Sequence, residues 1–187
     1  DWALMLDADE WPDSALWGAV AKLMKEDPPD TVGAEVHRQL MVHGMPLNFV
    51  CQPERRLRLV RPEHSSVAGS CGDQAEGIHD RIQVEGKTIR LPGKLMHDAF
   101  VDLADALSRN LGYAQVEAGS NRSHGGLGRL LLSPLAAFCK QYVLKQGFRD
   151  GRRGFLMSQT MAMVTWQKHI LAAERRLLDH EANKSHL

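Results

Sequence analysis

Apolar and polar residues alternate along much of roughly the first 100 residues, which is the pattern of half-buried β-strands. In the segment RRLRLVR, for example, Leu57 and Leu59 alternate with arginines. A turn at Glu85-Gly86 predicts a hairpin within IQVEGKTIRL. The strands predicted from this pattern cover residues 2–6, 33–44, 47–51, 55–61 and the two arms of 82–91.

Apolar residues recur at helical spacing in one early segment and throughout the second part of the chain. Asp13 can cap a first helix, which ends before Pro28. A second helix is predicted over residues 100–119. Two more are predicted at about 127–146, where Pro134 would introduce a kink, and at about 153–180.

The segment GSNRSHGG, residues 119–126, has the composition of a flexible connector. It is the best candidate for a boundary within the chain. We therefore expect a strand-rich part over residues 1–118, a linker over 119–126 and a basic helical extension over 127–187.

The segment LMLDADEWPD contains the first candidate chemistry. Residues two apart in an extended chain point to the same side, so Asp7 and Asp9 should project together where the first strand ends. Ligands of open α/β sheets bind at the carboxyl ends of strands, and paired carboxylates there can hold a divalent cation that bridges phosphate oxygens. The pattern therefore predicts a metal-diphosphate site. An EF-hand loop is excluded, because Trp11 and Pro12 stand where a ligand and the required glycine belong.

The order of several motifs along the chain points to one family. In sequence, the chain contains DWALMLDADEWPDSAL, RLRLVR, GIHDRI, LMHDAF and LSRNLGYA. These resemble the LDADE, RLFR, VHE, H-Y and K-x-x-R-Y segments in the second half of family 2 glycosyltransferases, especially the bacterial enzymes of lipopolysaccharide-core and cell-surface glycan assembly. The later FCKQYVLKQGFRDGRRGFL is similar to their tail, so the resemblance covers nearly the whole chain.

The resemblance implies an α/β fold, namely the C-terminal half of a GT-A (Rossmann-like) domain with a mixed sheet, followed by amphipathic helices. It also implies transfer of a sugar from a nucleotide-sugar to a glycolipid or glycan acceptor, with inversion at the anomeric carbon. The nucleotide-recognising units of the family precede the aspartate pair and are not in this chain. We therefore expect the chain alone to be inactive.

The resemblance further assigns roles to individual residues. Asp7 matches the aspartate near the nucleotide ribose, and Asp9 matches the aspartate that binds Mg²⁺ or Mn²⁺. Such a cation stabilises the negative charge that builds on the departing diphosphate. Asp80 matches the position of the catalytic base, which is usually Glu; a solvated aspartate on a loop is the structural alternative.

Three other residues are candidates for the same site. His97, at the end of the KLMH strand, is a possible metal ligand or diphosphate contact, although histidines at strand ends are often packed or surface residues. Arg58 and Arg61 match the family, and one of them is a candidate contact for phosphate or an acidic acceptor. Alternating arginines are also ordinary for a half-buried strand.

Charge is distributed unevenly along a chain whose formal net charge is zero. Residues 1–121 contain 12 basic and 19 acidic residues, whereas residues 122–176 contain 10 basic and 2 acidic residues. Amphipathic helices flanked by Lys and Arg bind anionic membranes, although packing against the first part of the chain is the alternative. The rival to an enzyme is therefore a non-catalytic module that binds anionic lipid or another anion through these helices. Nucleic acid is a poorer partner, because aromatic residues are only 6% of the chain.

The cysteines and the hydropathy of the chain indicate where in the cell the protein is expected. The three cysteines, Cys51, Cys71 and Cys139, are widely spaced and odd in number, which favours neither disulfides nor a zinc site. No run reaches the roughly 18 apolar residues of a spanning helix. We expect a cytoplasmic protein that binds peripherally to the inner face of the cytoplasmic membrane.

Overall fold

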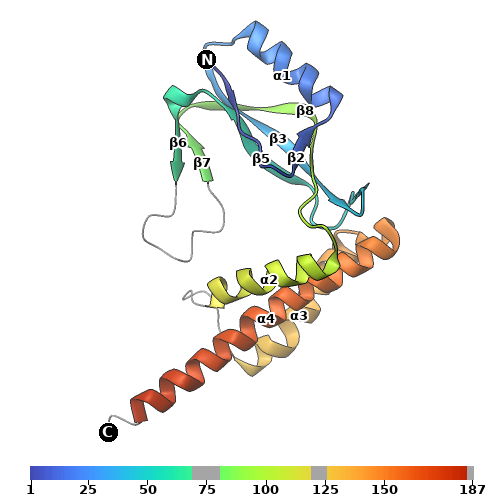
Figure 1. Cartoon of the computed structure of the whole chain (residues 1–187), viewed down its shortest axis with the longest axis vertical. Coiled ribbons are helices and arrows are strands. Elements are labelled where there is room, and N and C mark those ends of the chain that lie inside the picture. Colours follow the sequence, from blue (N-terminus) through green and yellow to red (C-terminus); the bar gives the residue numbers. More distant parts are fainter. Residues whose placement is uncertain (69–80, 119–125, 185–187) are drawn as a thin grey trace. The chain divides into compact units, whose positions relative to one another are not determined.

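The computed structural model describes residues 1–68, 81–118 and 126–184, which fall into two compact units. The first unit contains residues 1–68 and 81–99, and the second contains residues 100–118 and 126–184. Figure 1 shows the strands in the first unit and three long helices in the second. The first unit is therefore mixed α/β and the second is helical.

A six-stranded mixed sheet forms the framework of the first unit. Its strands are β1 (Ala3–Leu4), β2 (Glu10–Pro12), β3 (Thr31–Val42), β4 (Met45–Pro46), β5 (Glu54–Val60) and β8 (Lys87–His97). They lie in the order β1-β5-β3-β8-β2, with β4 paired to β3. β3 and β8 run parallel, whereas the other neighbours are antiparallel. After the 3-10 turn η1 (Pro62–His64), β6 (Ser65–Ala68) and β7 (Arg81–Val84) form a separate two-stranded sheet.

The structure confirms the strands predicted at 33–44 and 55–61 but corrects two others. Residues 47–51 form turns and bends rather than a strand. The predicted hairpin is also wrong, because β7 pairs with β6 while β8 pairs with β3 and β2. A two-residue turn is only a local signal, and here pairing with strands distant in sequence determines the topology.

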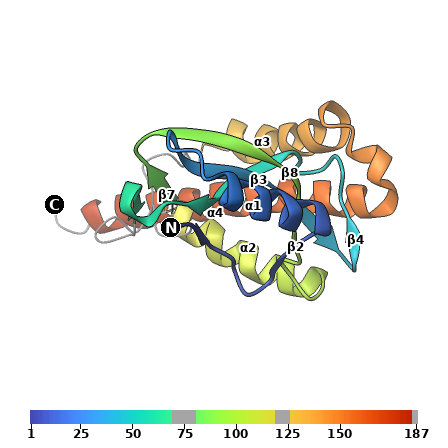
Figure 2. The same ribbon diagram turned by 90° about the horizontal axis from the view of Figure 1, so that it is seen from above.

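Helix α1 (Ser14–Glu26) covers one face of the sheet, as Figure 2 shows. It begins and ends as predicted: Asp13 Oδ1 accepts a hydrogen bond from Leu16 N at 2.7 Å, and Asp27 ends the helix in the left-handed conformation. Its apolar stripe enters the core of this unit. The buried members of that core are Leu16, Val20, Leu23, Ala34, Val36, Leu59, Leu91 and Leu95.

Gly93 allows α1 to approach β8 closely. Its φ is +90°, a conformation that other residues rarely adopt. A Cβ at this position would lie 2.2 Å from the backbone nitrogen of Leu16. Because Gly93 has no side chain, the first turn of α1 can pack directly against β8. This contact also positions the chain that leads back to Asp9.

The second unit is built on α4 (Gly151–Lys184), which packs against α2 (Leu103–Ala118) and α3 (Leu127–Cys139) (Figure 1). A π-helical turn η2 (Lys140–Leu144) and a 3-10 turn η3 (Gly147–Asp150) connect α3 to α4. Small residues allow the helices to pack closely; those that are buried are Ala106 and Ala114 on α2 and Ala162 and Ala172 on α4. None of the described helices combines the length and apolar content needed to cross a membrane.

The three helices predicted after residue 100 are confirmed. They fall together in the second unit. The sequence places a boundary at 119–126, whereas the units of the structure divide between Ala99 and Phe100. α2 belongs to the second unit because it packs along α4.

Candidate functional site

Asp7 and Asp9 lie on the turn that joins β1 to β2. The turn is closed by a hydrogen bond from Glu10 N to Asp7 O at 3.1 Å. Both carboxylates reach solvent, since the side chains of Asp7 and Asp9 are 51% and 40% exposed. The sequence predicts that the pair leads from a strand into a helix; in the structure the short strand β2 intervenes before α1.

This turn lies at the carboxyl end of β8. β8 ends at His97, which is opposite Glu10 in the β2–β8 ladder and opposite Leu40 in the parallel β3–β8 ladder. The backbone nitrogen of Asp98 donates a hydrogen bond to Asp9 O at 3.1 Å. The carboxyl end of parallel strands is where open α/β sheets bind their ligands, so the aspartate pair occupies a position suited to binding.

A buried network of charges lies directly behind the turn. Glu10 is its centre: the side chain is 0% exposed, and its Oε1 accepts hydrogen bonds from Arg38 Nε at 2.5 Å and Arg58 Nη2 at 2.7 Å. Asp7 Oδ2 also accepts a hydrogen bond from Arg58 and lies 3.7 Å from Arg38 Nη2. A second carboxylate on the sheet, Glu54, lies 3.4 Å from Arg38 Nη1. The two arginines thus join the exposed turn to the interior of the sheet.

Arg58 reaches this network because of a β-bulge. Ala34 on β3 is opposite Leu59, and Glu35 is opposite Leu57, so Arg58 is the extra residue between them. Burial opposes the charge of its guanidinium, but hydrogen bonds and attraction from Glu10 and Asp7 outweigh burial and raise the pKa of Arg58. The Nε of Arg58 is buried without a hydrogen-bond partner among the described residues. The hydrogen bonds from Nη2 to the carboxylates of Asp7 and Glu10 offset this loss of hydration.

His97 is buried beside Asp9 and is neutral at neutral pH. Burial, followed by the nearby charge of Arg38, lowers the pKa of His97 below its ordinary value despite the opposing carboxylates of the network. Arg38 Nη2 lies 3.1 Å from His97 Nδ1, and since a guanidinium can only donate, Nδ1 accepts. Asp9 Oδ1 lies 3.4 Å from the same nitrogen.

The structure separates Arg61 from the other predicted residues. Its guanidinium stacks over the ring of Trp2 at 4.4 Å and bonds to Asp27 Oδ1 at 2.6 Å and to the carbonyl of Thr31 at 3.0 Å. Hydrogen bonds from Trp2 and then from Arg61 lower the pKa of Asp27. Arg61 therefore ties the C-terminal end of α1 to the sheet, whereas Arg58 contacts Asp7.

Three further residues bear on the site: the predicted base Asp80, and Arg38 and Glu10, which the sequence motifs do not indicate. Asp80, the predicted base, lies outside the described residues. The sequence motifs assign no role to Arg38 or Glu10, which form the centre of the network. The only available signals were the position of Glu10 directly after the aspartate pair and the presence of Arg38 as the single Lys or Arg of residues 31–42.

Whether the aspartate pair fits a divalent cation can be judged from its oxygens. Within the described residues, no group of three or more His, Cys, Asp and Glu side chains is placed to hold a metal ion. Mg²⁺, however, is usually bound by one or two carboxylates together with substrate phosphates and water. The contacts of Asp7 use Oδ2 and the ion pair of Asp9 uses Oδ1, so each carboxylate has a second oxygen that these contacts leave available. Two exposed carboxylates of this kind fit a cation that a diphosphate also binds.

No protein-family model matches the chain. No solved structure matches it either. The mixed α/β architecture is therefore established by the structure alone, and the functional reading rests on the site and on the motifs.

Proposed function

We propose that the protein is the metal- and acceptor-binding part of an inverting glycosyltransferase with a GT-A fold. It would transfer a sugar from a nucleotide-sugar to a glycolipid or cell-surface glycan acceptor, such as lipopolysaccharide core. The observation that carries this proposal is the position of Asp7 and Asp9, exposed together on one turn at the carboxyl end of β8. The ordered motifs of the family 2 glycosyltransferases support it.

In the proposed reaction, the acceptor hydroxyl oxygen bonds to the anomeric carbon as the bond from that carbon to the diphosphate breaks. The acceptor proton passes to a base on the opposite face of the sugar, a role assigned to Asp80. A bound Mg²⁺ or Mn²⁺ supplies stabilisation of the charge that builds on the diphosphate. Asp9 and Asp7 would hold the cation, and the family resemblance assigns Asp7 to the neighbourhood of the nucleotide ribose.

The buried network serves this site by holding the turn in place. Arg58 and Arg38 fix Asp7 from behind, and Glu10 neutralises part of their charge. We assign His97 to the buried network rather than to metal binding through Nδ1, because Nδ1 already accepts a hydrogen bond from Arg38. Arg61 is assigned to the stability of the unit rather than to phosphate binding, given its contacts with Trp2 and Asp27.

The proposed setting follows from the acceptor. A protein that adds sugar to a membrane glycolipid from a cytoplasmic nucleotide-sugar would work at the inner face of the cytoplasmic membrane, bound there peripherally. Its partners would be the nucleotide-sugar, the glycan acceptor and the membrane surface, and nucleic acid would not be among them.

The metal site can be tested by titrating the chain with Mn²⁺ in the presence of inorganic pyrophosphate, using electron paramagnetic resonance to measure free Mn²⁺. We expect one cation to bind per chain, and Asp9→Asn to weaken binding by about tenfold or more, which corresponds to about 1.4 kcal/mol. Asp30→Asn is the matched control, because Asp30 is an exposed aspartate of the same unit remote in sequence from the turn. Equal affinity of the Asp9→Asn and Asp30→Asn variants would refute the proposed metal site.

The assignment of the base is tested separately in an enzyme that contains this chain and transfers sugar. Asp80→Asn should lower kcat by about 100-fold at saturating acceptor, since general base catalysis contributes about 10²–10⁴. The binding of Mn²⁺ with pyrophosphate should be unchanged. A kcat close to that of the wild type would remove Asp80 from this role.

A further inference from the structure

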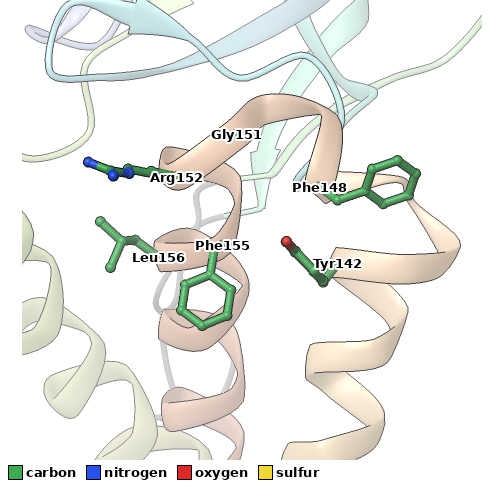
Figure 3. Close-up of a pocket in the computed structure, with 6 residues that line it drawn as sticks. All are labelled: Tyr142, Phe148, Gly151, Arg152, Phe155 and Leu156. Carbon is green, nitrogen blue, oxygen red and sulfur yellow. The ribbon is translucent and has the colours of Figure 1, made fainter.

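A pocket of about 510 Å³ opens in the second unit where η2, η3 and the start of α4 meet. Figure 3 shows the residues that line it, which are Tyr142, Phe148, Gly151, Arg152, Phe155 and Leu156. All of them come from one short stretch of chain within the second unit. The pocket is therefore independent of the aspartate pair of the first unit.

The wall of the pocket is formed by packed aromatic rings. The ring of Tyr142 contacts Phe155 edge-on at 5.6 Å between centroids, contacts Phe148 at 6.3 Å, and stacks on Phe138 at 5.1 Å. In Figure 3 the hydroxyl of Tyr142 points toward α4. An aromatic ring with a polar tip is suited to a boundary between apolar material and water.

Apolar side chains remain open to solvent at the pocket and close to it in sequence. Phe148 is 52% exposed and Leu144 on η2 is 77% exposed. Other large apolar residues of the same stretch are also exposed, namely Leu131, Leu132, Leu135, Val143, Phe155 and Leu156. So many exposed large apolar side chains along one stretch of chain, three of them lining the pocket, indicate a binding surface.

Positive charge surrounds these apolar residues. Residues 127–157 contain six basic side chains and one acidic side chain, Asp150. Arg152 lines the pocket, and its neighbour Arg153 is exposed. In Figure 3, Arg152 and Leu156 extend to the same side of α4, so a cationic group and an apolar group are presented together.

The surface around the pocket combines apolar and basic groups, and a binding partner must satisfy both. A soluble anion such as phosphate would pair with the arginines but would leave the aromatic and leucine side chains exposed. A second copy of the chain would bring two faces of the same positive charge together, which is unfavourable. An anionic bilayer satisfies both features, because its headgroups pair with Arg and its acyl chains accept apolar side chains.

We propose that this pocket and its basic rim dock the second unit on a bilayer that contains anionic phospholipid. A lipid phosphate lies beside Arg152, and the adjoining acyl region contacts Phe148, Phe155 and Leu156. The exposed leucines of η2 and α3 enter the same interfacial layer. This proposal does not depend on sugar transfer, because no residue of the first unit takes part.

The test is sedimentation of the chain with vesicles of phosphatidylcholine, with and without phosphatidylglycerol. We expect the chain to bind the anionic vesicles at low salt, more weakly at high salt, and hardly at all to phosphatidylcholine alone. The double variant Arg152→Glu/Arg153→Glu should lower the partition coefficient between vesicles and water by about 30-fold or more. The reason is that each basic residue near an anionic surface contributes about fivefold to binding. Arg175→Glu/Arg176→Glu is the matched control: it makes the same change of charge elsewhere on the exposed surface of α4 and should have an effect of less than about threefold.

The apolar contribution is tested by Phe148→Asp, with Leu177→Asp as its control, because both side chains are exposed large apolar residues of the second unit. Only the Phe148 variant should lose vesicle binding, and circular dichroism should show that both variants remain folded. Asp9→Asn should bind vesicles like the wild type, which separates this proposal from the proposed metal site. Absence of binding at low salt, equal losses in both charge variants, or self-association that the Arg152/Arg153 variant abolishes without any vesicle binding would each overturn the proposal.

Discussion

The guanidinium of Arg38 donates a hydrogen bond through Nη2 to Nδ1 of His97, over a distance of 3.1 Å. The same guanidinium bonds to the fully buried Glu10 and lies near Asp7. Because His97 is beside Asp9, Arg38 connects both aspartates of the exposed turn to one buried network. The ionisation of His97 and the charge of Glu10 should therefore both affect the stability of this region.

Protonation of His97 should destabilise the protein. Its pKa is lowered in the folded state by burial and by Arg38, so the unfolded chain binds a proton more readily than the folded one. The contribution of His97 to stability is therefore fully present above its unfolded pKa of 6.5 and declines as the pH falls below that value. Urea denaturation at about pH 7.5 and about pH 5.5 should show a decrease in the free energy of unfolding.

The corresponding variant separates His97 from other acid-sensitive groups. In His97→Gln the decrease between the two pH values should be smaller than in the wild type, whereas His64→Gln, at an exposed histidine, should behave like the wild type. A pH dependence that is identical in all three proteins would contradict a buried, neutral His97.

Glu10→Gln should destabilise the protein strongly. The substitution keeps the shape of the side chain but removes the negative charge that Arg38 and Arg58 share in the interior. Loss of one partner from a buried ion pair costs about 3–5 kcal/mol in the free energy of unfolding. Glu35→Gln is the control, because its ion pair with Arg90 is exposed and should be worth less than about 1 kcal/mol. Similar costs for the two variants by urea denaturation would mean that the buried network does not stabilise the fold.

Gly93→Ala should disrupt the packing of α1 on β8. The new Cβ would meet the backbone of Leu16 at 2.2 Å, and the positive φ of Gly93 adds strain. We expect a loss of more than about 2 kcal/mol in thermal or urea unfolding. Gly18→Ala, within α1 and with nothing within 4 Å of the added atom, should instead be neutral or stabilising by up to about 1 kcal/mol. A Gly93→Ala protein as stable as the wild type would exclude this close approach.

Arg61→Lys should affect stability but not ligand binding. A lysine cannot reproduce the stacking on Trp2 together with the bonds to Asp27 and Thr31, and the loss should be about 1 kcal/mol. Affinity for Mn²⁺ with pyrophosphate should remain that of the wild type. Weaker binding with unchanged stability would instead support the phosphate-binding role that the sequence predicts for Arg61.

Local signals in the sequence predicted local structure well. The capping carboxylate of Asp13 and the spacing of the apolar residues after it are sufficient to predict α1, and both act within a few residues. The pairing of β8 with β3 depends on strands far apart in the chain, and the turn at Glu85-Gly86 is misleading because its two arms join different sheets. A periodic pattern of apolar residues does not show which distant strands pair with each other.

The same distinction applies to the site. The motifs brought Asp7 and Arg58 into one site, and the structure pairs them. The role of Arg38 cannot be predicted from the sequence, because its partners Glu10 and His97 come from two other strands. Arg61 is only three residues from Arg58 but lies past the end of β5, and this difference between neighbouring arginines is visible only in three dimensions.

Binding of a divalent cation at the turn of Asp7 and Asp9 can be measured by the paramagnetic broadening that Mn²⁺ causes in backbone amide NMR signals. With substoichiometric Mn²⁺ and inorganic pyrophosphate, the signals of residues 7–10 and of Asp98 should broaden first, while those of Asp27 and Asp30 remain sharp. The selective broadening should disappear in Asp9→Asn. Uniform broadening, or broadening centred on other carboxylates, would contradict the account.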